Sequence, residues 1–117
     1  MSDFTIYHNP RCSKSRQTLQ LLEDNGIAPQ VVRYLDDTPD ADTLRVLLGK
    51  LGISARQLLR KGEVEYKERG LADETLGDEQ LIAAMCEQPK LIERPIVVRG
   101  DRAVLGRPPE NVLSLID

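Results

Sequence analysis

The fold is decided by residues 4–16, which read FTIYHNPRCSKSR. The run from Phe4 to Tyr7 is rich in β-forming residues and predicts a strand. Residues 13–25 predict a helix that ends at Gly26, with Leu19 and Leu22 on its inner face. Cys12 therefore lies where a strand passes into the first turn of a helix.

This position favours a reactive thiol. Backbone N–H groups in the first turn of a helix are unpaired, and the helix dipole favours negative charge there. His8, Arg11, Lys14 and Arg16 add positive charge nearby. Both effects favour the thiolate, which is the reactive form of cysteine. We therefore predict that Cys12 is a nucleophile rather than a buried, inert cysteine.

Composition limits the class of protein. The chain has 117 residues, of which 40% are hydrophobic, enough for a single domain over residues 1–117 with one core. It contains no apolar run of membrane-spanning length and no signal-peptide pattern, and two cysteines fit a reducing cytoplasm. The net charge of −3 argues against nucleic-acid binding. We expect a cytoplasmic protein without membrane or nucleic-acid partners.

The remaining pattern completes an α/β fold. A strand is predicted at 30–34, and after the polar break 36–40 comes a helix carrying Leu44, Leu47, Leu48 and Leu51. A short helix capped by Ser54, loops and broken helix over 61–77, and a helix from Asp78 to before Pro89 follow. The chain then forms a β-hairpin over 95–105 and a final helix from Pro108 carrying Val112, Leu113 and Ile116. The first βαβ unit should be parallel with a right-handed crossover, and the hairpin adds antiparallel pairing. This order predicts a thioredoxin-like three-layer fold with a mixed four-stranded sheet and an all-helical insertion.

Two residues near Cys12 have alternative roles. As an imidazolium, His8 would lower the thiol pKa, and as a neutral imidazole it could accept the thiol proton. It could also be only a hydrogen-bonded structural residue. Ser15 could donate a hydrogen bond to the thiolate, although satisfying the first helical turn is the default role for a serine there.

The chain has no Cys-x-x-Cys pair, because Ser15 stands where the second cysteine would be. Disulfide chemistry at Cys12 would then need another thiol. Cys86 lies in a predicted helix and is interpreted as a structural cysteine, so an external thiol such as glutathione is the simpler proposal. Position 18 is threonine and Arg16 comes too early for the Cys-x5-Arg loop of tyrosine phosphatases, which disfavours phosphatase activity. No Cys/His spacing indicates a zinc site and no Gly-rich loop a nucleotide, so we expect no bound metal or cofactor.

Three arginines are candidates for oxyanion binding, since a guanidinium keeps its charge and offers a planar set of donors. Arg60 ends a Leu-Leu-Arg turn, Arg94 precedes Pro95 at a strand entrance, and Arg107 precedes Pro108 after the hairpin. Pro95 is a candidate for a cis peptide bond, because proline at the first residue of a strand is unusual. The pattern does not show whether the arginines converge.

These motifs resemble those of the glutaredoxin-coupled arsenate reductases from one end of the chain to the other. The matching segments are His8-Asn9-Pro10 with Cys12 and Ser15-Arg16, Leu58-Leu59-Arg60, Glu93 to Val98, and Gly106-Arg107-Pro108. The resemblance implies a thioredoxin-like fold in which the residue matching Pro95 is the cis-proline.

The resemblance also implies a mechanism. Cys12 would attack arsenate, His8 would help to keep the thiol ionised, and Ser15 would assist. The oxyanion and the arsenic adduct would be held by three arginines, Arg60, Arg94 and Arg107. Glutathione, the external reductant, would then reduce the adduct to As(III), and glutaredoxin would remove the resulting mixed disulfide.

One departure affects the interpretation. Arsenic-resistance members of the family carry Gly-Thr after the cysteine, whereas this chain has Ser13-Lys14, as in an uncharacterised arsenate-reductase-like subgroup. The alternatives are a thiol oxidoreductase acting on another substrate and, ranked lower, a redox-linked transcriptional adaptor. Such adaptors use Cys-x-x-Cys, and the arginine set would have no purpose in one. A relative that has lost activity is disfavoured because the motif residues are intact.

Overall fold

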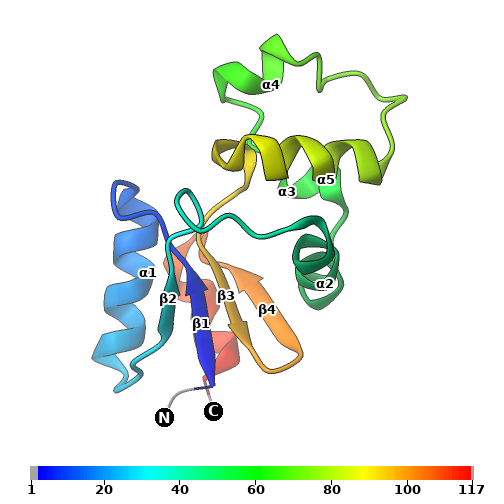
Figure 1. Cartoon of the computed structure of the whole chain (residues 1–117). Helices are drawn as coiled ribbons and strands as arrows, with labels where there is room; N and C mark the ends of the chain where they lie inside the picture. Colours follow the sequence, from blue (N-terminus) through cyan, green and yellow to red (C-terminus); the bar gives the residue numbers. More distant parts are fainter. Residues whose placement is uncertain (1–2, 117) are drawn as a thin grey trace. The chain divides into compact units, whose positions relative to one another are not determined.

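The computed structural model of the protein describes residues 3–116. Figure 1 shows the chain passing in turn through a strand–helix–strand unit, a helical stretch, a hairpin and a final helical turn. The strands are β1 (Phe4–Tyr7), β2 (Gln30–Val32), β3 (Ile96–Arg99) and β4 (Arg102–Leu105), and the helical elements are α1 (Ser13–Asp24), α2 (Ala41–Leu51), α3 (Ala55–Leu58), α4 (Val64–Glu68), α5 (Asp78–Glu87) and the 3-10 helices η1 (Pro89–Leu91) and η2 (Pro109–Leu115).

The four strands form one mixed sheet in the order β2-β1-β3-β4. Strand β1 pairs in parallel with β2 and antiparallel with β3, so that Ile6 lies opposite both Val31 and Val97. Strands β3 and β4 form the predicted antiparallel hairpin, with Val97 opposite Val104. The predicted α/β, thioredoxin-like fold with an inserted helical stretch is confirmed.

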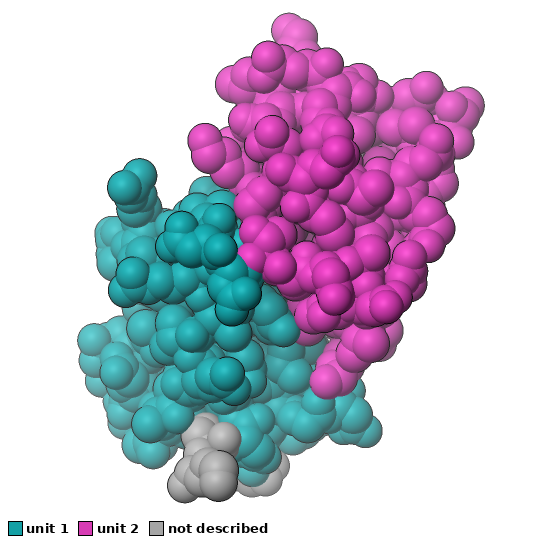
Figure 2. All heavy atoms as spheres, in the orientation of Figure 1, with its two compact units in different colours: residues 1–37, 94–117 teal, residues 38–93 magenta. Residues whose placement is uncertain are grey.

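The chain divides into two compact units, shown in teal and magenta in Figure 2. Residues 1–37 and 94–117 form the first, here called the sheet unit, and residues 38–93 form the second, here called the helical unit. The helical unit is the predicted insertion. A compact unit is not in itself an independently folding domain, so the single domain expected over residues 1–117 stays a prediction.

The core of the sheet unit follows from strand alternation. Phe4 and Ile6 on β1 point to the same side of the sheet because side chains alternate with period two. They pack with the other buried members of one apolar cluster, Leu22 of α1, Val97 of β3, and Val112 and Leu115 of η2. This packing fixes α1, and hence Cys12 at its start, against the sheet.

The helical unit has its own apolar side chains. Leu44 and Leu47 of α2 are buried, as the helical spacing of the leucines predicts, and so is Leu58 of α3. Helix α5 packs against α2, α3 and η1. Asp40 caps α2 by accepting a hydrogen bond from the Thr43 N–H, and Ser54 forms a capping box with Gln57 at the start of α3. No helix of the described chain is long and apolar enough to cross a membrane.

The final helix differs from the prediction. The sequence predicts a final helix carrying Val112, Leu113 and Ile116, but the element observed, η2, is a 3-10 helix in which Leu113 is 45% exposed. Its buried residues are Pro109, Val112 and Leu115. Because these are spaced by three, they line up on one face only at three residues per turn.

Candidate active site

The loop before Cys12 is ordered by its own backbone. The His8 N–H donates to the Val32 carbonyl, which continues the pairing of β1 with β2 by one residue. The Asn9 side-chain oxygen then accepts from the Arg11 N–H, and the Asn9 carbonyl accepts from the Cys12 N–H. This Asx turn delivers Cys12 as the N-cap of α1 with extended backbone angles, φ −95° and ψ 123°.

The Cys12 thiol is half-buried and has a lowered pKa. Burial by itself raises the pKa, but the Ser15 backbone N–H, the Arg94 side chain and the Lys14 backbone N–H outweigh it. Among residues 3–116, no conventional side-chain cap hydrogen bond forms at this helix start. The first-turn N–H groups therefore remain available to stabilise negative charge on the sulfur or on a bound anion.

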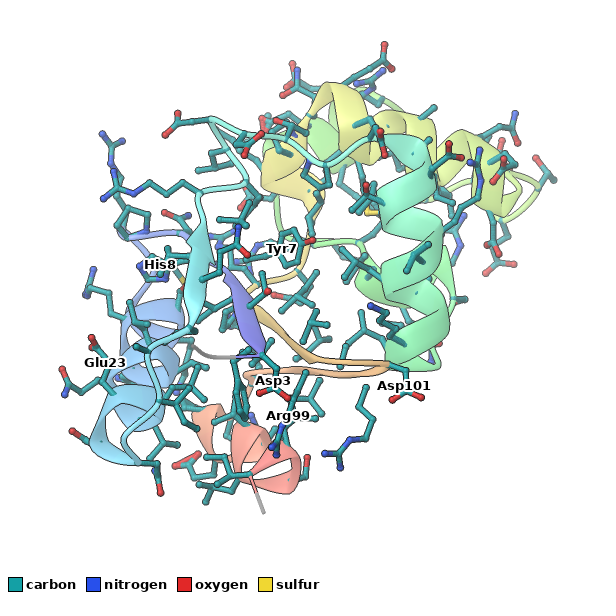
Figure 3. All side chains as sticks on the ribbon, turned by 60° about the horizontal axis from the view of Figure 1, so that its bottom comes forward. Asp3, Tyr7, His8, Glu23, Arg99 and Asp101 are labelled. Carbon is teal, nitrogen blue, oxygen red and sulfur yellow. The ribbon has the colours of Figure 1, made fainter. Side chains whose placement is uncertain are left out.

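His8 is buried at the end of β1, at the opposite end of this strand from the Asp3–Arg99 ion pair (Figure 3). Its Nδ1 lies 2.6 Å from the Ser15 hydroxyl oxygen. Burial, followed by the charges of Arg33 and Arg16, lowers the His8 pKa. The environment therefore favours the neutral imidazole, the proton-accepting alternative.

Ser15 does not act as the helix cap that its position suggested. Its oxygen accepts from the Asn9 N–H at 3.0 Å, so its hydroxyl proton is available for His8 Nδ1. This assignment places the His8 ring proton on Nε2. Ser15 is buried and connects α1 to the preceding loop, while Cys12 occupies the cap position.

Arg94 and Arg107 are brought together by two tied loops. The Gly106 N–H donates to the Pro95 carbonyl at 2.9 Å, and Arg107 Nη1 donates to the Arg94 carbonyl at 3.3 Å. The Arg94–Pro95 bond is cis, as the resemblance implied, and the Arg107–Pro108 bond is also cis. The sheet unit thus gathers Cys12 and two of the three predicted arginines.

Arg60 belongs to the helical unit. Its Nη1 donates to Glu93 Oε1 at 2.6 Å, and its Nε lies 3.4 Å from Glu63 Oε1. The backbone at both ends of this ion pair is also fixed, because the Arg60 N–H donates to the Leu91 carbonyl and the Glu93 N–H to the Leu58 carbonyl. Two carboxylates therefore orient this guanidinium.

Cys86 is half-buried on α5 and is a free thiol, like Cys12. Burial and then the negative charge of Asp40 raise its pKa. The environments of the two cysteines thus act in opposite directions, which agrees with interpreting Cys86 as a structural residue.

Sequence reasoning missed two supporting residues. Thr18 donates from its hydroxyl to the Lys14 carbonyl at 2.7 Å and to the Gly106 carbonyl at 3.2 Å, which ties α1 to the loop before Arg107. Glu93 orients Arg60. The Asn-Pro dipeptide was a usable signal for the turn before Cys12, whereas Thr18 and Glu93 carry no local signal.

Within residues 3–116, no group of three or more His, Cys, Asp and Glu side chains is placed to hold a metal ion. The fold and the site define a thioredoxin-like protein with one activated cysteine at the start of its first helix. The ArsC family profile matches residues 7–115, and the chain belongs to this family.

The relatives span nearly the whole chain. The uncharacterized protein YfgD of Escherichia coli K12 is 59% identical over 112 residues, covering 95% of this chain and 94% of that protein. An arsenate reductase of Neisseria meningitidis is 46% identical over 117 residues, covering 99% and 100%. The solved structure of an arsenate reductase from Vibrio cholerae has a TM-score of 0.95 at 54% identity, covering 97% of each chain.

Proposed function

We propose that this protein reduces arsenate to arsenite, with Cys12 as nucleophile and with glutathione and glutaredoxin supplying the electrons. The observation that carries the proposal is the placement of the Cys12 thiol as the N-cap of α1, where, against the effect of burial, the Ser15 backbone N–H and the Arg94 side chain lower its pKa. These same groups would stabilise an oxyanion that approaches the sulfur. Full-length similarity to proteins named arsenate reductase supports the choice of substrate.

Each site residue receives a role in this proposal. Arg94 and Arg107 bind the arsenate oxygens through guanidinium donors, and Arg60 supplies a third guanidinium. His8, as a neutral imidazole, receives the thiol proton through Ser15: the Ser15 hydroxyl passes its own proton to His8 Nδ1 across the 2.6 Å contact and takes up the thiol proton in its place. Pro95 shapes the loop that carries Arg94.

The reaction balances without a bound cofactor. The Cys12 thiolate forms a bond to arsenic and an arsenate oxygen leaves as water. A glutathione thiol then bonds to arsenic and a second oxygen leaves as water. The glutaredoxin thiolate attacks the glutathione sulfur and forms a mixed disulfide, and the electron pair of the broken sulfur–arsenic bond stays on arsenic, which becomes As(III). Water then releases arsenite from Cys12 and returns its proton to the thiol.

Glutathione thus acts as an external reductant, and the absence of a second cysteine at position 15 fits this requirement. The proposal places the reaction in the cytoplasm, where glutathione is kept reduced.

The test is arsenate-dependent NADPH oxidation in a coupled assay with glutathione, a glutaredoxin and glutathione reductase. We expect a saturable rate that is abolished in Cys12→Ser and nearly unchanged in Cys86→Ser. Survival of the rate in Cys12→Ser would overturn the nucleophile assignment. The Ser13-Lys14 pair leaves one competitor, a thiol oxidoreductase. It would instead show Cys12-dependent turnover of glutathione mixed disulfides without arsenate.

A further inference from the structure

We propose that a cavity at the carboxyl ends of β1 and β2 binds glutathione by its charged ends and so orients the reductant thiol beside Cys12. This inference rests on the proposed function and deepens it by assigning a site to the second substrate.

The cavity has a volume of about 280 Å³ and lies wholly within the sheet unit. It is lined from the loop after β1 by His8 and Arg11, and from the loop after β2 by Arg33, Leu35 and Asp36. Crevices outside the carboxyl ends of parallel strands are where ligands bind in open α/β sheets. The first of these loops leads directly into Cys12, because Arg11 immediately precedes it, although Cys12 itself does not line the cavity. A tripeptide held here by its charged ends would extend its thiol along this loop towards the nucleophile.

The charged groups of the cavity are available to a ligand. Among residues 3–116, the side chains of Arg11, Arg33 and Asp36 make no hydrogen bond or ion pair with another residue. The loop that carries two of them is nevertheless fixed, because the Arg33 carbonyl accepts from the Asp36 N–H at 3.0 Å. Cationic side chains that face a cavity and have no partner within the described chain are suited to binding anions from solution.

The mixture of charges favours a peptide over an inorganic oxyanion. Two guanidiniums match carboxylates, but Asp36 would repel arsenate or phosphate and would attract an ammonium group. Glutathione carries two carboxylates and one ammonium group. The volume lies near the lower end of the range for ligand pockets, so the cavity holds the charged ends of a tripeptide and leaves its thiol outside.

Binding can be measured apart from catalysis. S-Methylglutathione, whose sulfur cannot form a disulfide, is titrated calorimetrically into Cys12→Ser protein, then into the same protein carrying Arg33→Ala or Asp36→Asn. We expect either change to raise the Kd about tenfold, as loss of one charged contact predicts. The matched control is Arg102→Ala, which removes an exposed arginine of β4 that does not line the cavity, and should leave the Kd unchanged.

The outcomes separate the two proposals. Absent binding, equal Kd values in all variants, or an equal effect of Arg33→Ala and Arg102→Ala would overturn the cavity assignment. In the active protein, Arg33→Ala should raise the KM for glutathione and leave the KM for arsenate unchanged. A rise confined to the KM for arsenate or to the KM for glutaredoxin would also overturn the cavity assignment. Absent arsenate turnover would overturn only the proposed function, because the calorimetric titration does not depend on it.

Discussion

At the scale of single residues, Cys12 and Cys86 place the same thiol in two contrasting environments. The pKa of Cys12 is lowered and that of Cys86 is raised from the same ordinary value of 9.0. We expect the alkylation rate of Cys12 to reach half its maximum at a pH below 9.0, and that of Cys86 at a pH above it. Iodoacetamide kinetics on Cys86→Ser and Cys12→Ser, respectively, measure each thiol alone. A reversed order would contradict the assigned environments.

The same measurement tests Arg94. Its side chain is among the groups that lower the Cys12 pKa, after the Ser15 backbone N–H. Arg94→Gln should therefore shift the alkylation midpoint of Cys12 upward, because it removes a positive charge near the thiolate. Arg102→Gln is the charge-matched control and should leave the midpoint in place.

His8 gives a second titration at this scale. It is the one histidine of the chain, so its ring gives a single set of resonances. Its pKa is lowered from 6.5 by burial and then by Arg33 and Arg16. We expect an NMR midpoint below 6.5 that moves upward in Arg33→Ala.

The lowered pKa of His8 determines how its contribution to folding stability changes with pH. Below pH 6.5 the unfolded chain binds the His8 proton more readily than the folded one. The stabilising contribution of a neutral His8 is therefore complete above pH 6.5 and is lost as pH falls through the folded pKa. Urea unfolding at a series of pH values at and below 6.5 measures this loss. In His8→Gln the free energy of unfolding should depend less on pH over the same range.

Local pattern was sufficient to place Cys12 but not to explain its pKa. A strand followed by a polar turn and a helical run predicts which residue begins the helix. The assignment of Ser15 as a cap was wrong because the cap is set by where the backbone turns helical, which occurs at Cys12. Arg94 was recognised as a candidate, but its approach to Cys12 depends on the pairing of β1 with β3, which is not encoded locally.

At the scale of elements, Gly106 sets how closely α1 approaches the loop of Arg94 and Pro95. A Cβ at Gly106 would lie 2.5 Å from Thr18 Oγ1 and 2.7 Å from Pro95 Cγ. Gly106→Ala should therefore destabilise the fold by about 1–3 kcal/mol, the usual cost of overpacking a buried contact. Chemical unfolding measures this difference.

Gly49 in α2 provides the matched control. No heavy atom in the described part of the chain, apart from its chain neighbours and its own helix backbone, lies within 4 Å of a Cβ built there. Gly49→Ala should therefore stabilise the protein by about 0.5–1 kcal/mol through helix propensity. Equal changes in the free energy of unfolding for Gly49→Ala and Gly106→Ala would show that a side chain at position 106 is accommodated without cost.

Element positions were predicted well where one period dominates. The leucines of α2 repeat with helical spacing, and Leu44, Leu47 and Leu48 are buried. Gly26 after α1 and Gly52 after α2 both have a positive φ, as the prediction that these helices end at glycines requires. The last segment was predicted as an ordinary helix, whereas η2 is a 3-10 helix whose buried residues, Pro109, Val112 and Leu115, repeat every three positions. Thr18 looked like an ordinary helical residue, since its partner Gly106 comes from the other end of the chain.

At the scale of the whole molecule, the predicted site residues are divided between the two units. Cys12, Arg94 and Arg107 come from the sheet unit and Arg60 from the helical unit. The resemblance to a family named all four, whereas sequence periodicity could not relate Arg60 to Cys12. The structure adds the reason for the orientation of Arg60, which is its contacts with Glu63 and Glu93. Glu93 directly precedes Arg94 in the sequence.

This division predicts that Arg60 can be removed without changing the thiol. All the groups that lower the Cys12 pKa belong to the sheet unit. Arg60→Ala should therefore reduce arsenate turnover at subsaturating arsenate while the alkylation midpoint of Cys12 stays where it is. Arg60→Lys keeps the charge but loses the planar pair of donors, so it should restore stability more fully than turnover.

The free energy of unfolding of Arg60→Ala is the necessary control for its loss of turnover. Arg60, Glu63 and Glu93 are only 22%, 26% and 24% exposed, so Arg60→Ala leaves two carboxylates partly buried without this cation. We expect a loss of about 1–3 kcal/mol in urea unfolding, and Arg60→Ala with Glu93→Gln should recover part of it. Turnover should not recover in this double variant, because the guanidinium is still absent. Full recovery of turnover would mean that Arg60 acts only by holding Glu93, and it would remove this arginine from the oxyanion site.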